Sequence, residues 1–236
     1  MNKYLITIFF FLAGTSVSVG QDCRTQLKQA YQMMADFDIM EGFYIDYTAK
    51  VVTADTEKTE RIKSYGKGSK SVVESKDYRL YQDDSVIVSI IEPNKTIFIA
   101  RRAKSARVED QFEKIVTIQD SLLRSAKDVQ CISGQTDYGT HEYTIVPNDD
   151  LVQRFFIRDY IIWTDEKGQM TRSLINYNSG ALKSLEMVIH EYSNFLEKPI
   201  FSGTALEMVT AGKSLKERYS TYKLIDSRKP ATSNVN

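Results

Sequence analysis

The stretch YQDDSVIVSIIEPNKTIFIA, from Tyr81 to Ala100, decides the fold class. Two runs rich in β-branched residues, Val86–Ile91 and Ile97–Ala100, flank a turn at Pro93-Asn94, which is the pattern of a β-hairpin. A half-exposed antiparallel strand alternates apolar and polar residues. These two strands hardly alternate and are apolar on both faces. The pattern therefore predicts a cover on both faces, supplied either by this chain or by an apolar ligand.

The rest of the chain predicts more strands and two helices, from apolar residues spaced two or three to four positions apart. The helices are expected at Arg24–Met40 and Val108–Ala126. The further strands are expected at Phe43–Thr53, Arg61–Glu74, Glu142–Val146, Arg154–Thr164, Met170–Tyr177 and Ser184–Glu191. Because helices and strands do not alternate as β-α-β units, the order predicts an α+β fold with an antiparallel sheet.

The composition is that of an ordinary globular protein, with 236 residues, 42% hydrophobic and 26% charged. Its length suits one domain or two small ones. The 31 basic residues balance the 31 acidic ones. This balance gives no overall attraction to nucleic acid or to an anionic membrane.

The first twenty residues have the pattern of a secretory signal peptide. Lys3 precedes the apolar run LITIFFFLA, and Ser18 and Gly20 are small residues before a cleavage position at Gln21. A membrane anchor is the alternative, but the run is shorter than the about 20 helical residues that span a bilayer. We therefore expect residues 1–20 to be removed and the chain to be exported in soluble form.

The chain has two cysteines, Cys23 and Cys131. In an oxidising compartment such a pair readily forms a disulfide. A bridge that closes so long a loop stabilises a fold by about 4–5 kcal/mol in the chain-entropy model. Two free thiols are the alternative, because the sequence does not give their separation.

No catalytic or metal-binding pattern is present. His141 and His190 lack neighbours at metal-ligand spacing. The segment Tyr65–Lys70, YGKGSK, lacks the spacing of a phosphate-binding loop and reads as a glycine-containing kink in a strand. No Gly-x-Ser-x-Gly motif occurs. We therefore predict that the protein is not an enzyme and has no metal and no cofactor.

One basic cluster follows the hairpin, formed by Arg101, Arg102, Lys104 and Arg107. Such a cluster suits contact with an anionic headgroup or an acidic partner protein. A solvated loop before a helix is the alternative reading.

The order of elements and turns is specific enough to compare with a known family. The first half of the pattern is a helix after Cys23, a strand at Phe43–Thr53, the segment KDYRLY at Lys76–Tyr81, the turn Asp83-Asp84, and the strand Val86–Ile91 followed by Glu92-Pro93. The second half is the segment HEYTIVP at His141–Pro147, the strand Ile157–Thr164, the turn Asp165–Gly168, the strand Met170–Tyr177, and Asn194 with Pro199-Ile200-Phe201. This order resembles the periplasmic outer-membrane lipoprotein carrier family, the LolA-like fold, over residues 25–205.

The resemblance implies an antiparallel sheet curled into an incomplete barrel, with helices over its concave face. It also implies location in the periplasm and a LolA-like domain at 21–205. The resemblance does not cover residues 206–236, which we expect to be a C-terminal extension with a polar, disordered end.

In that fold the space between sheet and helices holds acyl chains. Strand alternation then gives a predicted cavity lining of Phe43, Ile45, Tyr47, Val86, Val88, Ile97, Ile99, Phe155, Ile157 and Ile161, with Tyr31, Met34, Ile115 and Leu122 as a helical lid.

Two functions follow as expectations. The first is a carrier that binds a lipid or the acyl part of a lipoprotein in an apolar half-barrel. The second is a non-enzymatic interaction or regulatory subunit of the envelope, with the same fold, membrane-protein partners and no lipid cargo.

Overall fold

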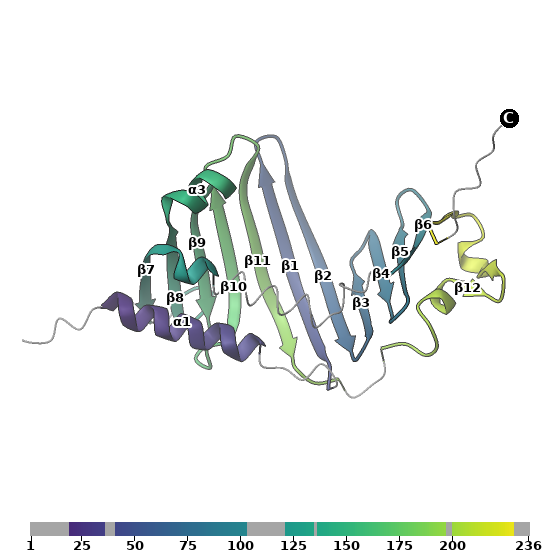
Figure 1. Cartoon of the computed structure of the whole chain (residues 1–236), viewed down its shortest axis with the longest axis horizontal. Helices are drawn as coiled ribbons and strands as arrows, with labels where there is room; N and C mark the ends of the chain where they lie inside the picture. The colour runs from purple at the N-terminus through teal and green to yellow at the C-terminus, as the bar shows by residue number, and fades with distance from the viewer. Residues whose placement is uncertain (1–18, 36–40, 103–120, 135, 197–199, 229–236) are drawn as a thin grey trace, which may run out of the picture.

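One large curved sheet dominates the protein (Figure 1). A computed structural model describes residues 19–35, 41–102, 121–134, 136–196 and 200–228. Within them, twelve strands lie in the order β14-β6-β5-β4-β3-β2-β1-β11-β10-β9-β8-β7. Their bounds are β1 Phe43–Thr53, β2 Glu57–Lys67, β3 Lys70–Glu74, β4 Tyr78–Gln82, β5 Val86–Ile91, β6 Thr96–Arg101, β7 Ala126–Ser133, β8 His141–Pro147, β9 Ile157–Thr164, β10 Met170–Tyr177, β11 Leu182–Ser193 and β14 Lys223–Asp226.

The sheet joins two antiparallel meanders. Strands β1 to β6 form one meander, and β7 to β11 form the other. The first strand of one, β1, pairs antiparallel with the last strand of the other, β11. Only β14 breaks the antiparallel pattern among the described strands, because it pairs in parallel with β6. The predicted α+β class with an antiparallel sheet is therefore confirmed, and β1 and β10 have the predicted bounds.

The first helix, α1 (Val19–Ala35), covers the β7 end of the sheet. Its buried residues Cys23, Leu27 and Tyr31 pack in one cluster with sheet residues that include Val129 and Tyr143. The predicted disulfide between Cys23 and Cys131 is present, with its Cα atoms 5.5 Å apart. It fixes the start of α1 to β7.

In the second meander the structure differs from the sequence prediction at one element, and another predicted element lies largely outside the described residues. Residues 149–155 form the helix α3 (Asp149–Phe155), whereas a strand was expected from Arg154 onward. The side chain of Asn148 caps this helix by accepting a hydrogen bond from the N–H of Leu151 at 3.0 Å. The helix predicted at Val108–Ala126 lies largely outside the described residues. Residues 121–124 are helical, and Ala126 already belongs to β7.

The chain after residue 200 is part of a core rather than an appended extension. Phe201, Ala205, Val209 and Tyr219 are buried in one cluster with the inward residues of β3 to β6. The short elements of this C-terminal segment are η1 Leu206–Met208, β12 Thr210–Ala211, β13 Ser214–Leu215 and η2 Glu217–Tyr219, before β14. It provides one of the two covers that the apolar hairpin was predicted to need.

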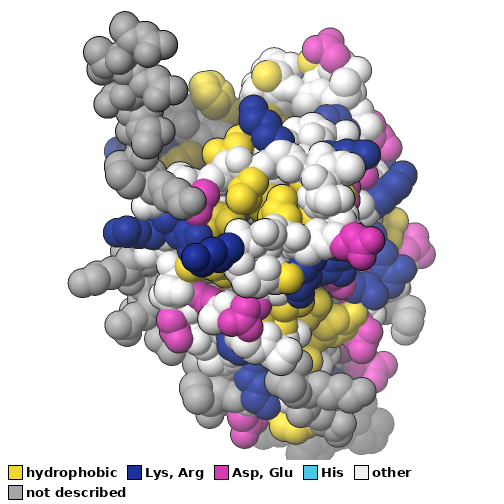
Figure 2. Space-filling view, turned by 90° about the vertical axis from the view of Figure 1, so that its right-hand side faces the viewer, with side chains coloured by type: hydrophobic (Ala, Val, Ile, Leu, Met, Phe, Trp, Pro, Cys, Tyr) yellow, Lys and Arg dark blue, Asp and Glu magenta, His cyan; other side chains and the backbone are white. Residues whose placement is uncertain are grey.

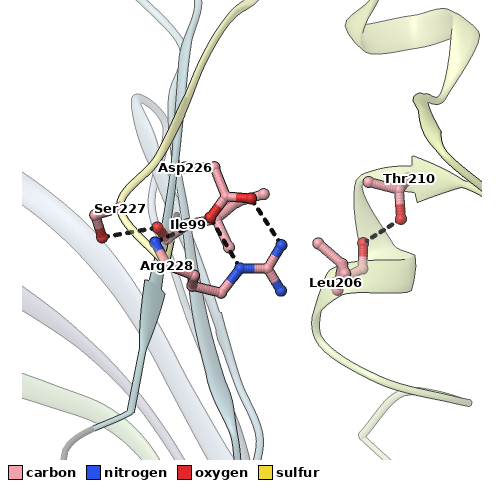
Figure 3. A network of polar contacts seen from close by, with 6 residues as sticks. All are labelled: Ile99, Leu206, Thr210, Asp226, Ser227 and Arg228. Atoms are coloured by element: carbon pink, nitrogen blue, oxygen red, sulfur yellow. Dashed lines mark hydrogen bonds and ion pairs between the residues drawn. The ribbon is translucent and has the colours of Figure 1, made fainter. Parts of the chain in front are cut away.

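Polar contacts hold the C-terminal segment in place. The Ser227 hydroxyl donates to the carbonyl oxygen of Ile99 at 3.0 Å, and the Arg228 guanidinium donates to the Asp226 carboxylate (Figure 3). Figure 2 views this end of the molecule and shows hydrophobic side chains interspersed with Lys and Arg. The segment thus joins the sheet both by apolar packing and by backbone pairing along β6.

Strand register assigns each residue to one of two faces, because directly paired residues lie on the same side of a sheet. We call the side that carries α1 the α1 face and the other side the opposite face. The C-terminal segment packs on the opposite face, against Val88, Ile90 and Ile97. The two described covers therefore lie at different ends of the sheet and on different faces.

Candidate functional site

A strip of apolar side chains crosses the α1 face between the two covered ends. We call it the central strip, and it consists of Ile45, Tyr47 and Val51 of β1, Ile62 of β2, Leu185, Met187 and Ile189 of β11, and Ile175 of β10. Register places these residues side by side: Tyr47 opposes both Ile62 and Ile189, and Val51 opposes Leu185. All of them are partly exposed, and Leu185 is 37% exposed.

The same strands are polar on the opposite face. The Asp46 carboxylate, almost fully buried, accepts two hydrogen bonds of 2.8 Å from Arg61. The Arg61 hydrogen bond lowers the pKa of Asp46, although burial acts in the other direction. Arg172 pairs with Glu186 at 2.6 Å. The central strip is therefore a property of one face and does not come from a generally apolar set of strands.

A second polar cluster on the opposite face fixes the β8–β10 strands. The Arg172 guanidinium stacks between the rings of Tyr138, at 3.7 Å, and Trp163, at 4.4 Å. The Trp163 indole N–H donates to the Glu142 carboxylate at 2.8 Å. Arg172 is paired with Glu186, and Glu142 accepts the hydrogen bond from Trp163, so we assign this cluster to stability.

Two tyrosines give the α1 face a polar group at the border of the central strip. Tyr160 of β9 opposes Ile175 of the strip, and its burial raises its pKa to about 12. Burial also raises the pKa of Tyr31 on α1. The Tyr31 hydroxyl is buried and has no hydrogen-bond partner among the described residues. A buried hydroxyl without a partner costs free energy, and a ligand oxygen beside it would remove that cost.

The structure divides the predicted lining residues between the faces. Ile45 and Tyr47 lie in the central strip, Phe43 continues their row on β1, and Ile157 lies on the same face of β9. Tyr31 faces the sheet from α1. Leu122 is half-buried next to β7. Ile115 and the side chain of Met34 lie outside what the structure describes.

Five predicted lining residues lie on the opposite face. Val86, Val88, Ile97 and Ile99 pack under the C-terminal segment, and Ile161 shares its face with Leu174 and Thr144. These residues are therefore no part of a site on the α1 face. Alternation divides the residues of each strand into two sets, one for each face. In the hairpin strands both sets are apolar, so the sequence did not show which set faces α1. Phe155, which was predicted on a strand, belongs to the helix α3 and is 57% exposed.

One arginine of the predicted basic cluster, Arg102, makes hydrogen bonds within the fold. The Arg102 guanidinium donates to the carbonyl oxygens of Ser69 and Asp83, at 3.2 and 3.0 Å. Arg101 is exposed at the end of β6. Lys104 and Arg107 lie outside the described residues. Among the described cationic residues of this cluster, only Arg101 is presented to solvent.

A polar notch, which the sequence did not predict, opens beside β2. The notch has a volume of about 1080 Å³ and is lined by Glu57–Arg61, Lys63, Glu74–Arg79, Ile91 and Pro93. It exists because β3 pairs only with Lys63–Lys67 of the longer strand β2. Within the described part of the chain, residues 57–62 pair with β1 alone.

The free side of β2 presents main-chain hydrogen-bonding groups to the notch. The two-residue turn at Gly68 makes Lys67 and Lys70 the closing, hydrogen-bonded pair of the β2–β3 hairpin. Hydrogen-bonded positions alternate along an antiparallel ladder. The N–H and C=O groups of Arg61, Thr59 and Glu57 therefore point away from β1. An extended peptide can pair with such an edge.

Neither a metal centre nor a membrane-spanning helix is found in the parts of the chain that the structure describes. No three His, Cys, Asp or Glu side chains in those parts lie together as a metal site. No helix there is long and apolar enough to cross a bilayer.

No protein-family model and no curated protein matches the sequence. Solved structures do match. A LolA superfamily protein from Nitrosomonas europaea is 12% identical with a TM-score of 0.35, over 77% of this chain and 95% of that one. LprF from Mycobacterium bovis is 5% identical with a TM-score of 0.46, over 76% and 96%. A putative outer membrane lipoprotein-sorting protein domain from Vibrio parahaemolyticus is 12% identical with a TM-score of 0.30, over 72% and 92%.

These matches include LolA-like proteins, the family that the element order resembles. At these identities and TM-scores they say nothing about cargo, partners or site residues.

Proposed function

We propose that this protein is an exported, non-enzymatic binding protein of the periplasm that holds an acyl chain, from a lipid or a lipoprotein, along the central strip. The observation that carries the proposal is the contrast between the faces of β1, β2, β10 and β11. One face carries the partly exposed strip, and the other carries paired charges such as Asp46 and Arg61. Partly exposed apolar side chains in a continuous row favour an apolar ligand.

The energetics suit an acyl chain. Burial stabilises by about 0.8 kcal/mol per methylene before ordering costs. The hydroxyl of Tyr31, buried and without a described partner, would donate to an ester or carboxyl oxygen near the α1 end of the strip. In this proposal residues 1–20 are the signal peptide that directs export.

The direct test is to purify the protein gently from the periplasm and measure its native mass. An added mass that extracts into organic solvent and identifies as lipid supports the proposal. A mass at the sequence value, with no uptake of a fluorescent fatty acid, would refute it.

Two variants, one inside and one outside the central strip, test whether the ligand binds there. Leu185→Glu puts a charge in the strip at a partly exposed position, so we expect roughly tenfold weaker fatty-acid binding from the lost apolar contact. Ile132→Glu is the matched control, because Ile132 is 62% exposed on β7 and belongs to the opposite face. Equal binding by the two variants would exclude the strip as the site.

Tyr31→Phe tests the polar end of the site. Loss of one hydrogen bond, about 0.5–1.5 kcal/mol, predicts up to about tenfold weaker binding of a fatty acid. The folding stability should stay the same or rise, because the variant removes a buried unpaired hydroxyl. Lower stability with unchanged fatty-acid affinity would show that the hydroxyl serves the fold.

The notch favours the second function, a subunit that binds an extended segment of an envelope protein. Thr59→Pro removes an outward N–H group and, because it lies on the free side of β2, keeps the pairing with β1. Thr59→Ala is the control that keeps this N–H group. A periplasmic protein retained by Thr59→Ala and lost by Thr59→Pro would support strand addition. Equal retention would argue against it.

A further inference from the structure

Two phenylalanines at the end of α3 protrude from the protein. Phe155 and Phe156 are 57% and 55% exposed. None of the residues of α3 is buried, so the helix holds these rings at the surface. Exposure of one large apolar side chain is common, whereas here two phenyl rings that follow each other in the sequence are both exposed.

The backbone holds Phe156 in a conformation that a phenylalanine rarely adopts. Its φ of 56° is in the left-handed region, at a helix C-terminus where glycine is the usual residue. Its N–H donates to the carbonyl oxygen of Val152 at 2.9 Å, and its carbonyl oxygen accepts from the N–H of Asn178 at 2.6 Å. These two bonds fix the conformation. A bulky side chain at a position that favours glycine, without burial of its ring, suggests a use for the ring itself.

The residue that follows the two phenylalanines adjoins the central strip. Ile157 follows Phe156 directly and pairs with Tyr177 of β10 on the α1 face. Ile175, two residues before Tyr177, pairs with Leu185 of the strip. The row therefore continues, through the partly buried side chains of Tyr177 and Ile157, to the ends of β9 and β10 near α3 (Figure 1).

We propose that Phe155 and Phe156 form a wedge that inserts into a lipid bilayer surface, next to the end of the central strip. Aromatic side chains are favoured at the interface of a bilayer, where their rings lie at the level of the headgroups. Two phenylalanines bury at most about 300–500 Å². This is below the about 800 Å² per partner of a stable protein interface, so a second copy or a folded partner is a poorer fit.

Local charges define how the wedge binds. Arg154 is paired with Asp150 at 3.1 Å, and Arg158 with Asp159 at 2.7 Å. The cations beside the rings are thus neutralised by neighbouring carboxylates. The wedge therefore binds by apolar insertion, and it should bind neutral vesicles and tolerate salt, unlike a basic patch.

The experiment measures flotation of the full protein with phosphatidylcholine vesicles, and with the same vesicles containing phosphatidylglycerol, at low and high salt. We expect binding to both kinds of vesicle at both salt concentrations. Phe155→Ser combined with Phe156→Gly should lower the partition coefficient by roughly tenfold or more, from the loss of two inserted rings. Ile132→Ser, an exposed apolar residue on β7, should leave it unchanged.

Phe156→Gly alone separates insertion from folding. Glycine suits the left-handed position, so the Tm should stay the same or rise while vesicle binding falls. Absence of vesicle binding, binding that salt abolishes, unchanged binding by the double variant, or a lower Tm of Phe156→Gly would each overturn the proposal.

The wedge is independent of the proposed cargo. Fatty-acid uptake from solution, measured without vesicles, tests the central strip, and the wedge variants should retain it. Vesicle binding that depends on the two phenylalanines, in a protein that takes up no fatty acid, would support the wedge and refute the carrier function.

Discussion

Asp83 connects the hairpin to the C-terminal segment, and Asp83→Asn should weaken that connection. The carboxylate is 6% exposed. One of its oxygens accepts from the N–H groups of Ser85 and Val86, both at 2.8 Å, and from the Ser85 hydroxyl at 3.0 Å. The other accepts from the N–H of Ala205 at 2.7 Å. If the asparagine oxygen keeps the hydrogen bonds from Ser85 and Val86, its NH₂ group faces the N–H of Ala205. Two donors then face each other, and the Ala205 N–H loses its acceptor.

The expected loss follows from these contacts. A hydrogen bond to a charged group contributes about 1.5–3 kcal/mol, and a buried donor left unpaired costs about 1–3 kcal/mol. We therefore expect Asp83→Asn to lower the free energy of unfolding by about 3 kcal/mol at neutral pH. Urea denaturation measures this loss, and faster hydrogen exchange of the Ala205 amide would locate it. Asp84→Asn, at an exposed neighbouring position, should change stability little.

The pH dependence gives a second test of the same carboxylate. Burial raises the pKa of Asp83, but the hydrogen bonds from Ala205, Ser85 and Val86 outweigh it and lower the pKa below its usual value. A depressed pKa stabilises the folded state above the pKa of the unfolded chain, about 3.9. This stabilisation is lost as pH falls through the folded-state pKa. The difference between wild type and Asp83→Asn should therefore shrink below about pH 4.

Two results would refute this reasoning. One is a loss below about 1 kcal/mol, which is within the range of one ordinary hydrogen bond. The other is a loss no larger than that of the Asp84 variant. Either would mean that the Asp83 carboxylate contributes little to holding the C-terminal segment, which would then depend on its apolar packing and on the pairing of β14 with β6.

Three other changes test the packing by urea denaturation. Cys23→Ala with Cys131→Ala opens a loop of 108 residues, so we expect a loss of about 4–5 kcal/mol, and a loss below about 1 kcal/mol would contradict the chain-entropy estimate. Gly66→Ala places a methyl group 2.5 Å from the ring of Phe43 and should cost about 1–3 kcal/mol, but much less in a Phe43→Leu background. Arg172→Met leaves a half-buried carboxylate unpaired and should cost about 3 kcal/mol and shift the fluorescence of the single tryptophan, and an unchanged emission spectrum would contradict the stacking.

The sequence predicted where the strands lie better than it predicted which side of the sheet each residue occupies. Alternation along Phe43–Thr53 specified that strand with its observed bounds, because its two faces differ in polarity. In Val86–Ile91 it did not, since Ile87 and Ile91 are as apolar as Val88 and Ile90. The phase of a strand decides which face it lines. The four hairpin residues therefore lie on the opposite face from Ile45 and Tyr47, with which the prediction had grouped them.

Local signals would have found one element that was missed. Asn148 followed by Asp149 and Asp150 is a helix N-cap with acidic residues in the first turn. That pattern would have predicted that Phe155 belongs to a helix and not to a strand that lines a cavity. The C-terminal segment had no such signal, because its two 3₁₀ turns and two-residue strands are shorter than any hydrophobic period. Its burial comes from packing against the hairpin, which one-dimensional spacing does not show.

The position of the C-terminal segment bears on what the other face binds. Had Phe201 and Val209 packed on the α1 face, the chain would have supplied its own cover there. They pack instead on the opposite face, where Lys70 donates to the carbonyl oxygens of Phe201 and Gly203 and Asp83 holds Ala205. On the α1 face, α1 covers the β7 end through the disulfide-linked cluster. Among the described residues, the apolar row from Ile45 to Leu185 is left partly exposed on this face. Lys58 and Glu60 of β2 lie beside it, opposite Val51 and Ala49, whereas the ion pair of Asp46 with Arg61 lies on the other face. In the proposed function an acyl chain would cover this row.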